Sequence, residues 1–282
     1  MKEHIREVVT QAIIKSKENW SDSLVGRYFD EPLVNFASGD DPLFEEFKQI
    51  IGSWHKTPRE AFEAAHGNGS WRGGTVVSWV MPWSKRLRKS NRLCTERPSI
   101  EWTQAYYLSS KILQKQVRAA LLQEMERYGV HGVAPADAEW FSIMDAPDGK
   151  TSPWSERHVG FAAGLGTFGL SDAFISEKGM AVVLNSVIID AVLEPDSRVA
   201  EHHLANCLHF ASGGCGVCIR RCPATAISIN GHNKNRCMVF GYGPKSIRLA
   251  KERGVEGPAG CALCQVGVPC ESRNPSTLVA AQ

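Results

Sequence analysis

Hydrophobic residues recur at helical spacing through the first 65 residues of the chain. Ile5, Val9 and Ile13 lie on one stripe between charged positions, which predicts an amphipathic surface helix. Spacings of three and four continue in the segment LFEEFKQIIGSW and up to about residue 65, so we expect this whole region to be helical. The glycine-rich segment HGNGSWRGG (66–74) then interrupts the pattern.

Two apolar runs rich in β-branched residues, TVVSWVMPW and GMAVVLNSVIID (179–190), predict buried strands. Between them, residues 102–129 have the pattern of a long amphipathic helix that ends at a glycine, and residues 155–172 predict a helix that runs into a glycine-rich turn. Strands and helices therefore alternate, which indicates an α/β or α+β core. After residue 195 the sequence changes to cysteine, glycine and short loops. We place a domain boundary there, between residues 1–195 and 196–282.

Composition and charge narrow the class of protein. The 282 residues are 43% hydrophobic and 22% charged, with a net charge of +2, which gives no argument for nucleic-acid or membrane binding. No stretch approaches the apolar length of a membrane span, and the N-terminal helix is unlike a signal peptide, so we expect a cytoplasmic protein. The one basic run, KRLRKSNR (85–92), is interpreted as a solvated loop or as a docking site for an acidic partner.

Cysteines supply the strongest chemical signal. Of nine cysteines, Cys94 stands alone, and the other eight fall in the final third of the chain. Such a group in a reducing cytosol predicts metal binding rather than disulfides. In bacterial two-cluster ferredoxins, the fourth cysteine of each run ligates the other cluster. Applying this exchange gives two four-thiolate sites. Cluster 1 takes Cys207, Cys215, Cys218 and Cys270. Cluster 2 takes Cys222, Cys237, Cys261 and Cys264.

Two metal chemistries can use these eight thiolates. Two zinc sites would need the same ligands. Pro223 directly follows a cysteine, as in iron–sulfur runs, and CPATAI has the texture of a ferredoxin. The gaps of three residues before Cys222 and five before Cys270 also suit an exchanged fourth ligand. We therefore predict two [4Fe-4S] clusters, forming an electron path that some other part of the chain must connect to a substrate.

The segment SERHVGFAAGLGTFGLSD, followed by GMAVVLNSVIID and then the cysteines, resembles the epoxyqueuosine reductase and reductive dehalogenase superfamily. The resemblance covers residues 70–275 and identifies the chain as a divergent, short member, with no clear tRNA-binding extension after residue 275. It implies a nitroreductase-like core that binds cobalamin, followed by a ferredoxin-like domain with two [4Fe-4S] clusters. It also implies an oxidoreductase in which electrons from an external low-potential donor, a ferredoxin or flavodoxin, pass through both clusters to cobalt.

The resemblance also implies roles for particular residues. The glycine-rich turn would pass close to the corrinoid, whereas helix capping and ordinary packing are the alternative explanation. Arg157 and His158 would face an anionic part of the corrinoid or make surface pairs. The residues of the turn are Gly164, Leu165, Gly166 and Gly169.

The proton donor is where the sequence departs from the family. Epoxyqueuosine reductases have an aspartate before their P-x-x-E-R-like segment, and here the matching positions offer Asp145, Asp148 or Lys150. Reductive dehalogenases use a tyrosine with a basic residue, for which Tyr106 or Tyr107 with Lys150 are candidates. The substrate is therefore open between an epoxyqueuosine-like molecule, in which case tRNA is a partner, and a small organohalide. The alternative function is a protein that transfers electrons or reduces a corrinoid without an organic substrate of its own.

Overall fold

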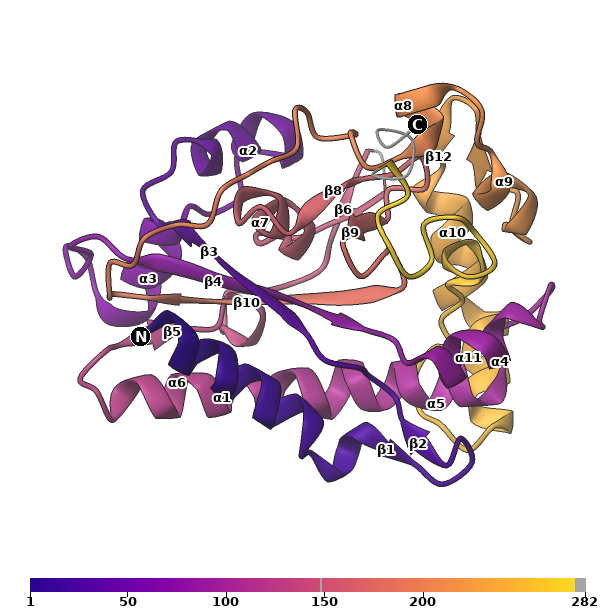
Figure 1. The fold of residues 1–282 in the computed structure, drawn as a ribbon, viewed down its shortest axis with the longest axis horizontal. Helices are drawn as coiled ribbons and strands as arrows, with labels where there is room; N and C mark the ends of the chain where they lie inside the picture. The colour runs from indigo at the N-terminus through magenta and orange to yellow at the C-terminus, as the bar shows by residue number, and fades with distance from the viewer. Residues whose placement is uncertain (148, 277–282) are drawn as a thin grey trace.

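Four antiparallel strands form the central sheet, in the order β3–β4–β10–β5 (Figure 1). These strands are β3 (Leu33–Ser38), β4 (Thr75–Pro82), β10 (Val182–Ile189) and β5 (Gly132–Val133). The computed structural model describes residues 1–147 and 149–276. The predicted strands β4 and β10 are confirmed, and they pair along their whole length at the centre of the sheet. Because all strand pairing among the described residues is antiparallel, the fold is α+β rather than α/β.

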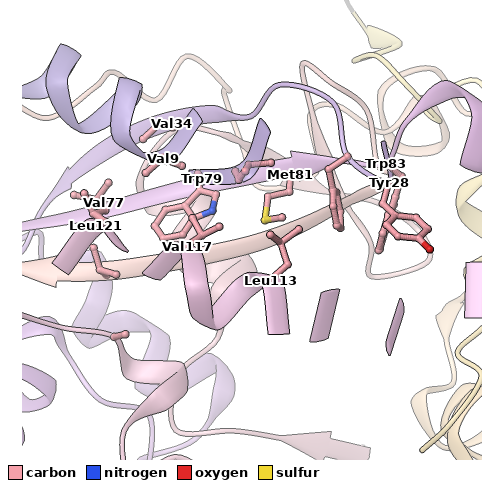
Figure 2. Close-up of a cluster of buried hydrophobic side chains, with 14 of the residues drawn as sticks. Val9, Tyr28, Val34, Val77, Trp79, Met81, Trp83, Leu113, Val117 and Leu121 are labelled. Carbon is pink, nitrogen blue, oxygen red and sulfur yellow. The ribbon is translucent and has the colours of Figure 1, made fainter. Parts of the chain in front are cut away.

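Helices cover both faces of the sheet, so successive residues of β4 enter different cores. Val77 and Trp79 meet α1 (Lys2–Ile14) and α6 (Gln114–Glu126), where Figure 2 shows Val9 and Val117 beside them. The other face packs on α2 (Leu43–Ile51), α3 (Pro58–His66) and α7 (Glu156–Ala162). Every residue of β4 is buried, which explains why its sequence is a continuous apolar run.

The expectation that residues 1–65 are entirely helical is wrong. α1, α2 and α3 are present, but β3 lies in the sheet beside β4, and the short strands β1 (Trp20–Ser21) and β2 (Gly26–Arg27) form a hairpin. A run of six residues is too short for periodicity to distinguish a strand from a helix. The pairing of β3 with β4 connects positions far apart in the sequence, and local pattern does not contain this information.

The predicted helix over 102–129 is confirmed, with an interruption. It consists of α5 (Ile100–Leu108), a π-helical turn (Ser109–Leu113) and α6, and it is followed by Gly129 at φ +70°. The expectation of a loop over 85–92 is wrong, because these residues form α4 (Lys85–Arg92). Ser84 caps this helix by accepting a hydrogen bond from the backbone N–H of Leu87, and Leu87 is fully buried. The helix is therefore amphipathic: Arg88 is buried with Leu87, and the other charged residues form the outer face.

Short elements complete the chain. Two hairpins, β6 (Met144–Ala146) with β7 (Gly149–Thr151) and β8 (Gly166–Phe168) with β9 (Phe174–Ser176), flank α7. The final third contains α8 (Leu208–Ser212), α9 (Val217–Arg221), β11 (Ile227–Ser228), β12 (Gly231–His232), α10 (Lys234–Tyr242) and α11 (Pro244–Glu252). Short 3₁₀ turns lie at Lys17–Asn19, Pro135–Asp137 and Leu263–Gln265.

The final third lies against α4, α5 and one end of the sheet (Figure 1). The Arg221 guanidinium donates hydrogen bonds to the carbonyl oxygens of Cys94, Leu263 and Val266. The buried carboxylate of Glu271 pairs with Arg92 at 2.5 Å, which ties the segment after Cys270 to α4. In the part of the chain that the structure describes, no helix has the length and apolar character needed to cross a membrane.

Candidate functional site

The eight cysteines of the final third lie in two groups of four. The first cysteine group is Cys207, Cys215, Cys218 and Cys270. The second cysteine group is Cys222, Cys237, Cys261 and Cys264. Burial raises the pKa of the Cys218 thiol to about 11, and Cys207 and Cys215 add to the rise. Burial raises the pKa of Cys261 to about 11, with further contributions from Cys237 and Cys222. The structure thus brings together the same two sets that the ferredoxin exchange predicts.

The chemistry of both groups suits a large cationic centre. All eight thiols are free and are partly or fully enclosed by protein. Within the residues described, no three His, Cys, Asp or Glu side chains converge on a position for one metal ion. Packed thiols with raised pKa values become thiolates when a metal neutralises them. Four such thiols in each group are the donor set that a four-iron cluster takes.

A small enclosed cavity marks the first cysteine group. All four of its cysteines line this cavity, together with Gly169, Ser171 and Met180. The backbone N–H of Met180 donates a hydrogen bond of 2.7 Å to the carbonyl oxygen of Cys270. The segment that leads into β10 therefore holds Cys270 beside cysteines from the region of α8 and α9, which come much earlier in the chain.

A larger cavity, of about 420 Å³, adjoins the second cysteine group. Its walls come from the start of β10, α5, the β6–β7 hairpin, α10 and residues 261–265. Cys237, Cys261 and Cys264 form part of this wall. Five aromatic side chains form an apolar wall of the cavity: Trp83, Trp102, Tyr106, Phe174 and Tyr242. A ligand in this space would contact both the thiols and this apolar wall.

The charged side chains of the cavity are mostly cationic. Lys150, Arg157 and Lys234 line it, and Asp172 pairs with His232 through a 3.0 Å contact between Oδ2 and Nδ1. Hydrogen bonds to Asp172 and to the Cys237 thiol raise the pKa of His232 to about 9. The electrostatics of the cavity therefore favour a ligand with an anionic group.

Two of the three predicted catalytic residues lie at this cavity. Burial raises the pKa of the Tyr106 hydroxyl above its ordinary value, and the ring of Tyr242 lies 5.9 Å away. Lys150 lines the cavity and forms an ion pair with Asp145. Asp145 itself is 88% exposed and is not part of the cavity wall. Tyr107 packs elsewhere, against α11, and Asp148 lies outside the described residues.

The predicted corrinoid-binding residues divide between several places. Arg157 lines the larger cavity and donates a hydrogen bond to the carbonyl oxygen of Asp172. His158 does not line it. Its Nδ1 lies 2.8 Å from the Ser155 hydroxyl oxygen, its ring packs on Phe47, and burial lowers its pKa to about 3.

The glycine-rich turn also lies away from the larger cavity. Gly164 has φ +71° and approaches the backbone of residue 197, and Gly166 approaches the carbonyl oxygen of Ile175. A side chain at either position would overlap these atoms. Leu165 is buried in a small core under β4, and Gly169 lines the cavity of the first cysteine group. Close backbone packing therefore accounts for Gly164 and Gly166.

Sequence reasoning missed Asp172 and His232. Nothing in their local sequence sets them apart, because the two residues are sixty positions apart and meet only in the folded chain. Asp172 has φ +57°, a left-handed conformation that is uncommon for a residue with a side chain. A backbone conformation of this kind cannot be read from one sequence.

Comparison with known proteins supports the predicted resemblance. The epoxyqueuosine reductase of Staphylococcus aureus is 31% identical over 140 residues, which are 47% of this chain and 32% of that protein. A selenomethionine-labelled epoxyqueuosine reductase has the same fold, with a TM-score of 0.50 and 15% identity over 96% of this chain and 65% of that one.

A second solved structure gives the same result. This is an epoxyqueuosine reductase with an epoxyqueuosine-modified tRNA-Tyr stem loop, with a TM-score of 0.50, 16% identity and the same coverage of both chains. No family model matches the chain. The chain covers 32% of the Staphylococcus aureus protein and 65% of each solved structure, so it spans under two thirds of the length of these proteins. The chain is similar to epoxyqueuosine reductases in sequence over about half its length, and it shares their fold over nearly all of it.

Proposed function

We propose that the protein is an iron–sulfur oxidoreductase that uses a corrinoid to reduce an organic substrate. One observation carries the proposal: three thiols of the second cysteine group form a wall of the larger cavity. An electron carrier held by those thiols would therefore border the space in which a corrinoid and a substrate can bind. Electron transfer needs such proximity, and a purely structural metal site has no use for it.

In this proposal, each cysteine group holds one [4Fe-4S] cluster through its four thiolates. The core over 1–195 is nitroreductase-like and holds the corrinoid in the larger cavity, and residues 196–282 form the ferredoxin-like part. When bound, the clusters carry electrons from an external ferredoxin or flavodoxin, and the corrinoid supplies a low-valent cobalt centre for the reduction. The apolar wall and the adjoining thiols suit a large flat cofactor.

The chain's own residues would bind the substrate and supply the proton. Because burial raises the pKa of Tyr106, its hydroxyl stays protonated at neutral pH and can donate a proton inside the cavity. Lys150 and Arg157 would orient an anionic part of the ligand. Asp145 holds Lys150 from the outside through their ion pair. The tryptophans of the apolar wall would exclude water from the reacting atoms.

Two substrate classes remain within this proposal. A relative was solved with an epoxyqueuosine-modified tRNA stem loop, which favours an epoxyqueuosine substrate carried on tRNA. The cationic residues of the cavity would suit the phosphates that flank such a nucleoside. A small organohalide would use the apolar wall instead.

A single-turnover assay tests the proposal. The anaerobic protein, loaded with iron, sulfide and cobalamin and reduced with titanium(III), is mixed with an epoxyqueuosine-modified stem loop or with a chlorophenol. We expect reduction of one of them, slowed about 100-fold or more by Tyr106→Phe, as for the loss of a general acid. Tyr107→Phe serves as the control, because Tyr107 lies outside the cavity. Reduction of cobalamin without conversion of either substrate would instead favour an electron-transfer protein.

A further inference from the structure

The Asp172–His232 pair joins two parts of the cavity wall. Asp172 belongs to the turn between β8 and β9, and His232 ends β12 just before α10. Their side chains meet at 3.0 Å, with His232 12% exposed and Asp172 39% exposed. Arg157 donates to the carbonyl oxygen of Asp172 and so fixes the turn from its other side. Asp172 therefore holds the His232 imidazole in one place, and Arg157 in turn fixes the position of Asp172.

The other side of the His232 ring faces the second cysteine group. The Cys237 thiol is close enough to the His232 ring to interact with it, and both residues line the larger cavity. The geometry is built into the start of α10. The Asn233 side chain accepts a hydrogen bond of 2.9 Å from the backbone N–H of Arg236, which closes the first helical turn and brings Cys237 back beside His232. His232 therefore lies between a carboxylate and a thiol.

Both neighbours of the ring accept hydrogen bonds once Cys237 is a thiolate. A metal-bound thiolate has no proton to donate, so a hydrogen bond between it and the ring uses an N–H of the ring. Nδ1 faces Asp172, which leaves Nε2 for the sulfur. Hydrogen bonds to the sulfurs of an iron–sulfur cluster are among the factors that set its reduction potential. They stabilise the reduced state because that state carries more negative charge.

We propose that His232, positioned by Asp172, donates a hydrogen bond to the Cys237 ligand and thereby raises the reduction potential of the cluster held by the second cysteine group. The inference rests on the proposed function for the presence of that cluster. It gives the pair a specific role. A higher potential at the cluster that borders the cavity would favour the transfer of electrons from the first cluster toward the cavity. Asp172 acts through the ring as a positioning residue.

A redox titration monitored by electron paramagnetic resonance tests the inference. Wild-type protein, His232→Leu and Asp172→Asn are loaded with iron and sulfide without corrinoid and titrated anaerobically. We expect His232→Leu to lower the potential of the second cluster, to leave the first cluster unchanged, and to keep the iron content. We expect Asp172→Asn to lower the potential of the second cluster by a smaller amount. His232→Gln keeps an N–H donor, so its second-cluster potential should lie between those of His232→Leu and wild type.

A matched control separates this effect from the general loss of a histidine. His131 pairs with Asp190 at 3.1 Å on the surface, and neither residue lines a cavity with the cysteines. His131→Leu should leave both potentials unchanged. Equal second-cluster potentials in wild type, His232→Leu and Asp172→Asn would overturn the inference. If His232→Leu fails to load iron, the second-cluster potentials of Asp172→Asn and His232→Gln test the inference instead. Potentials equal to that of wild type would again overturn it. Wild-type protein without iron would instead contradict the proposed function.

Discussion

The enclosed carboxyl group of Glu156 gives the stability of the protein a specific dependence on pH. Oε2 accepts a hydrogen bond of 2.6 Å from the Ser186 hydroxyl, whereas Oε1 is shielded from solvent and has no partner among the described residues. Burial raises the pKa of this carboxyl from its ordinary 4.5 to about 7. The folded protein therefore keeps a proton on Glu156 at pH values where the unfolded chain has lost it.

The sign and size of the effect follow from the two pKa values. A raised pKa contributes stability that is fully present below pH 4.5 and is lost as the pH rises through 7. Between pH 5 and pH 8, Glu156 alone should cost the wild type about 2.5 kcal/mol of unfolding free energy. Two buried histidines oppose it, because burial lowers the pKa of His55 to about 4 and of His158 to about 3. Each of these histidines should make the free energy of unfolding about 2 kcal/mol lower at pH 5 than at pH 8.

The variant Glu156→Gln isolates the contribution of the carboxyl group to the pH dependence of stability. Glutamine keeps the size of the side chain and an acceptor for the Ser186 hydroxyl, but it does not titrate. Urea denaturation of the metal-free, reduced protein, followed by tryptophan fluorescence, gives the free energy of unfolding at pH 5, 6.5 and 8. Relative to wild type, the variant should gain about 2.5 kcal/mol between pH 5 and pH 8. A stability difference that is the same at all three pH values would refute the reasoning.

Three further outcomes are expected. Glu271→Ala should destabilise the protein by about 3 kcal/mol in urea denaturation, because it leaves the buried Arg88 without its carboxylate; a change under about 1 kcal/mol would contradict this. Gly166→Ala should cost about 1–3 kcal/mol in the metal-free protein, since the new methyl group overlaps the Ile175 carbonyl oxygen; unchanged stability would favour a role in cofactor contact. Cys207→Ala should remove the first cluster signal and about four irons per chain; an unchanged iron content would exclude Cys207 as a ligand.

The sequence predicted elements whose signal is local. The two central strands, the N-terminal helix and the helix over 102–129 each carry a long pattern, and all four are present. β3 was missed because a six-residue strand is identified by its partner and not by its own period. α4 was missed because its composition is highly charged, while its capping serine and buried leucine reveal an amphipathic helix.

The residues of the candidate site also divide into those that the sequence could predict and those that it could not. Grouping of the eight cysteines was predictable because a known exchange rule relates their order to their partners. The predicted proton donors were only partly brought together: Tyr106 and Lys150 reach the cavity, and Asp145 lies outside it. Asp172 and His232 could not be predicted, because their role depends on a contact between the turn after β8 and the start of α10.

Metal and corrinoid analysis of the anaerobically reconstituted wild-type protein tests the central claim most directly. The protein is loaded with iron and sulfide, incubated with cobalamin and freed of unbound ligand before iron, zinc and cobalt are counted per chain. The account predicts about eight irons, as two four-iron clusters require, together with one bound corrinoid. Zinc in place of iron would contradict the cluster assignment, and about eight irons without any corrinoid would contradict the proposed use of the cavity.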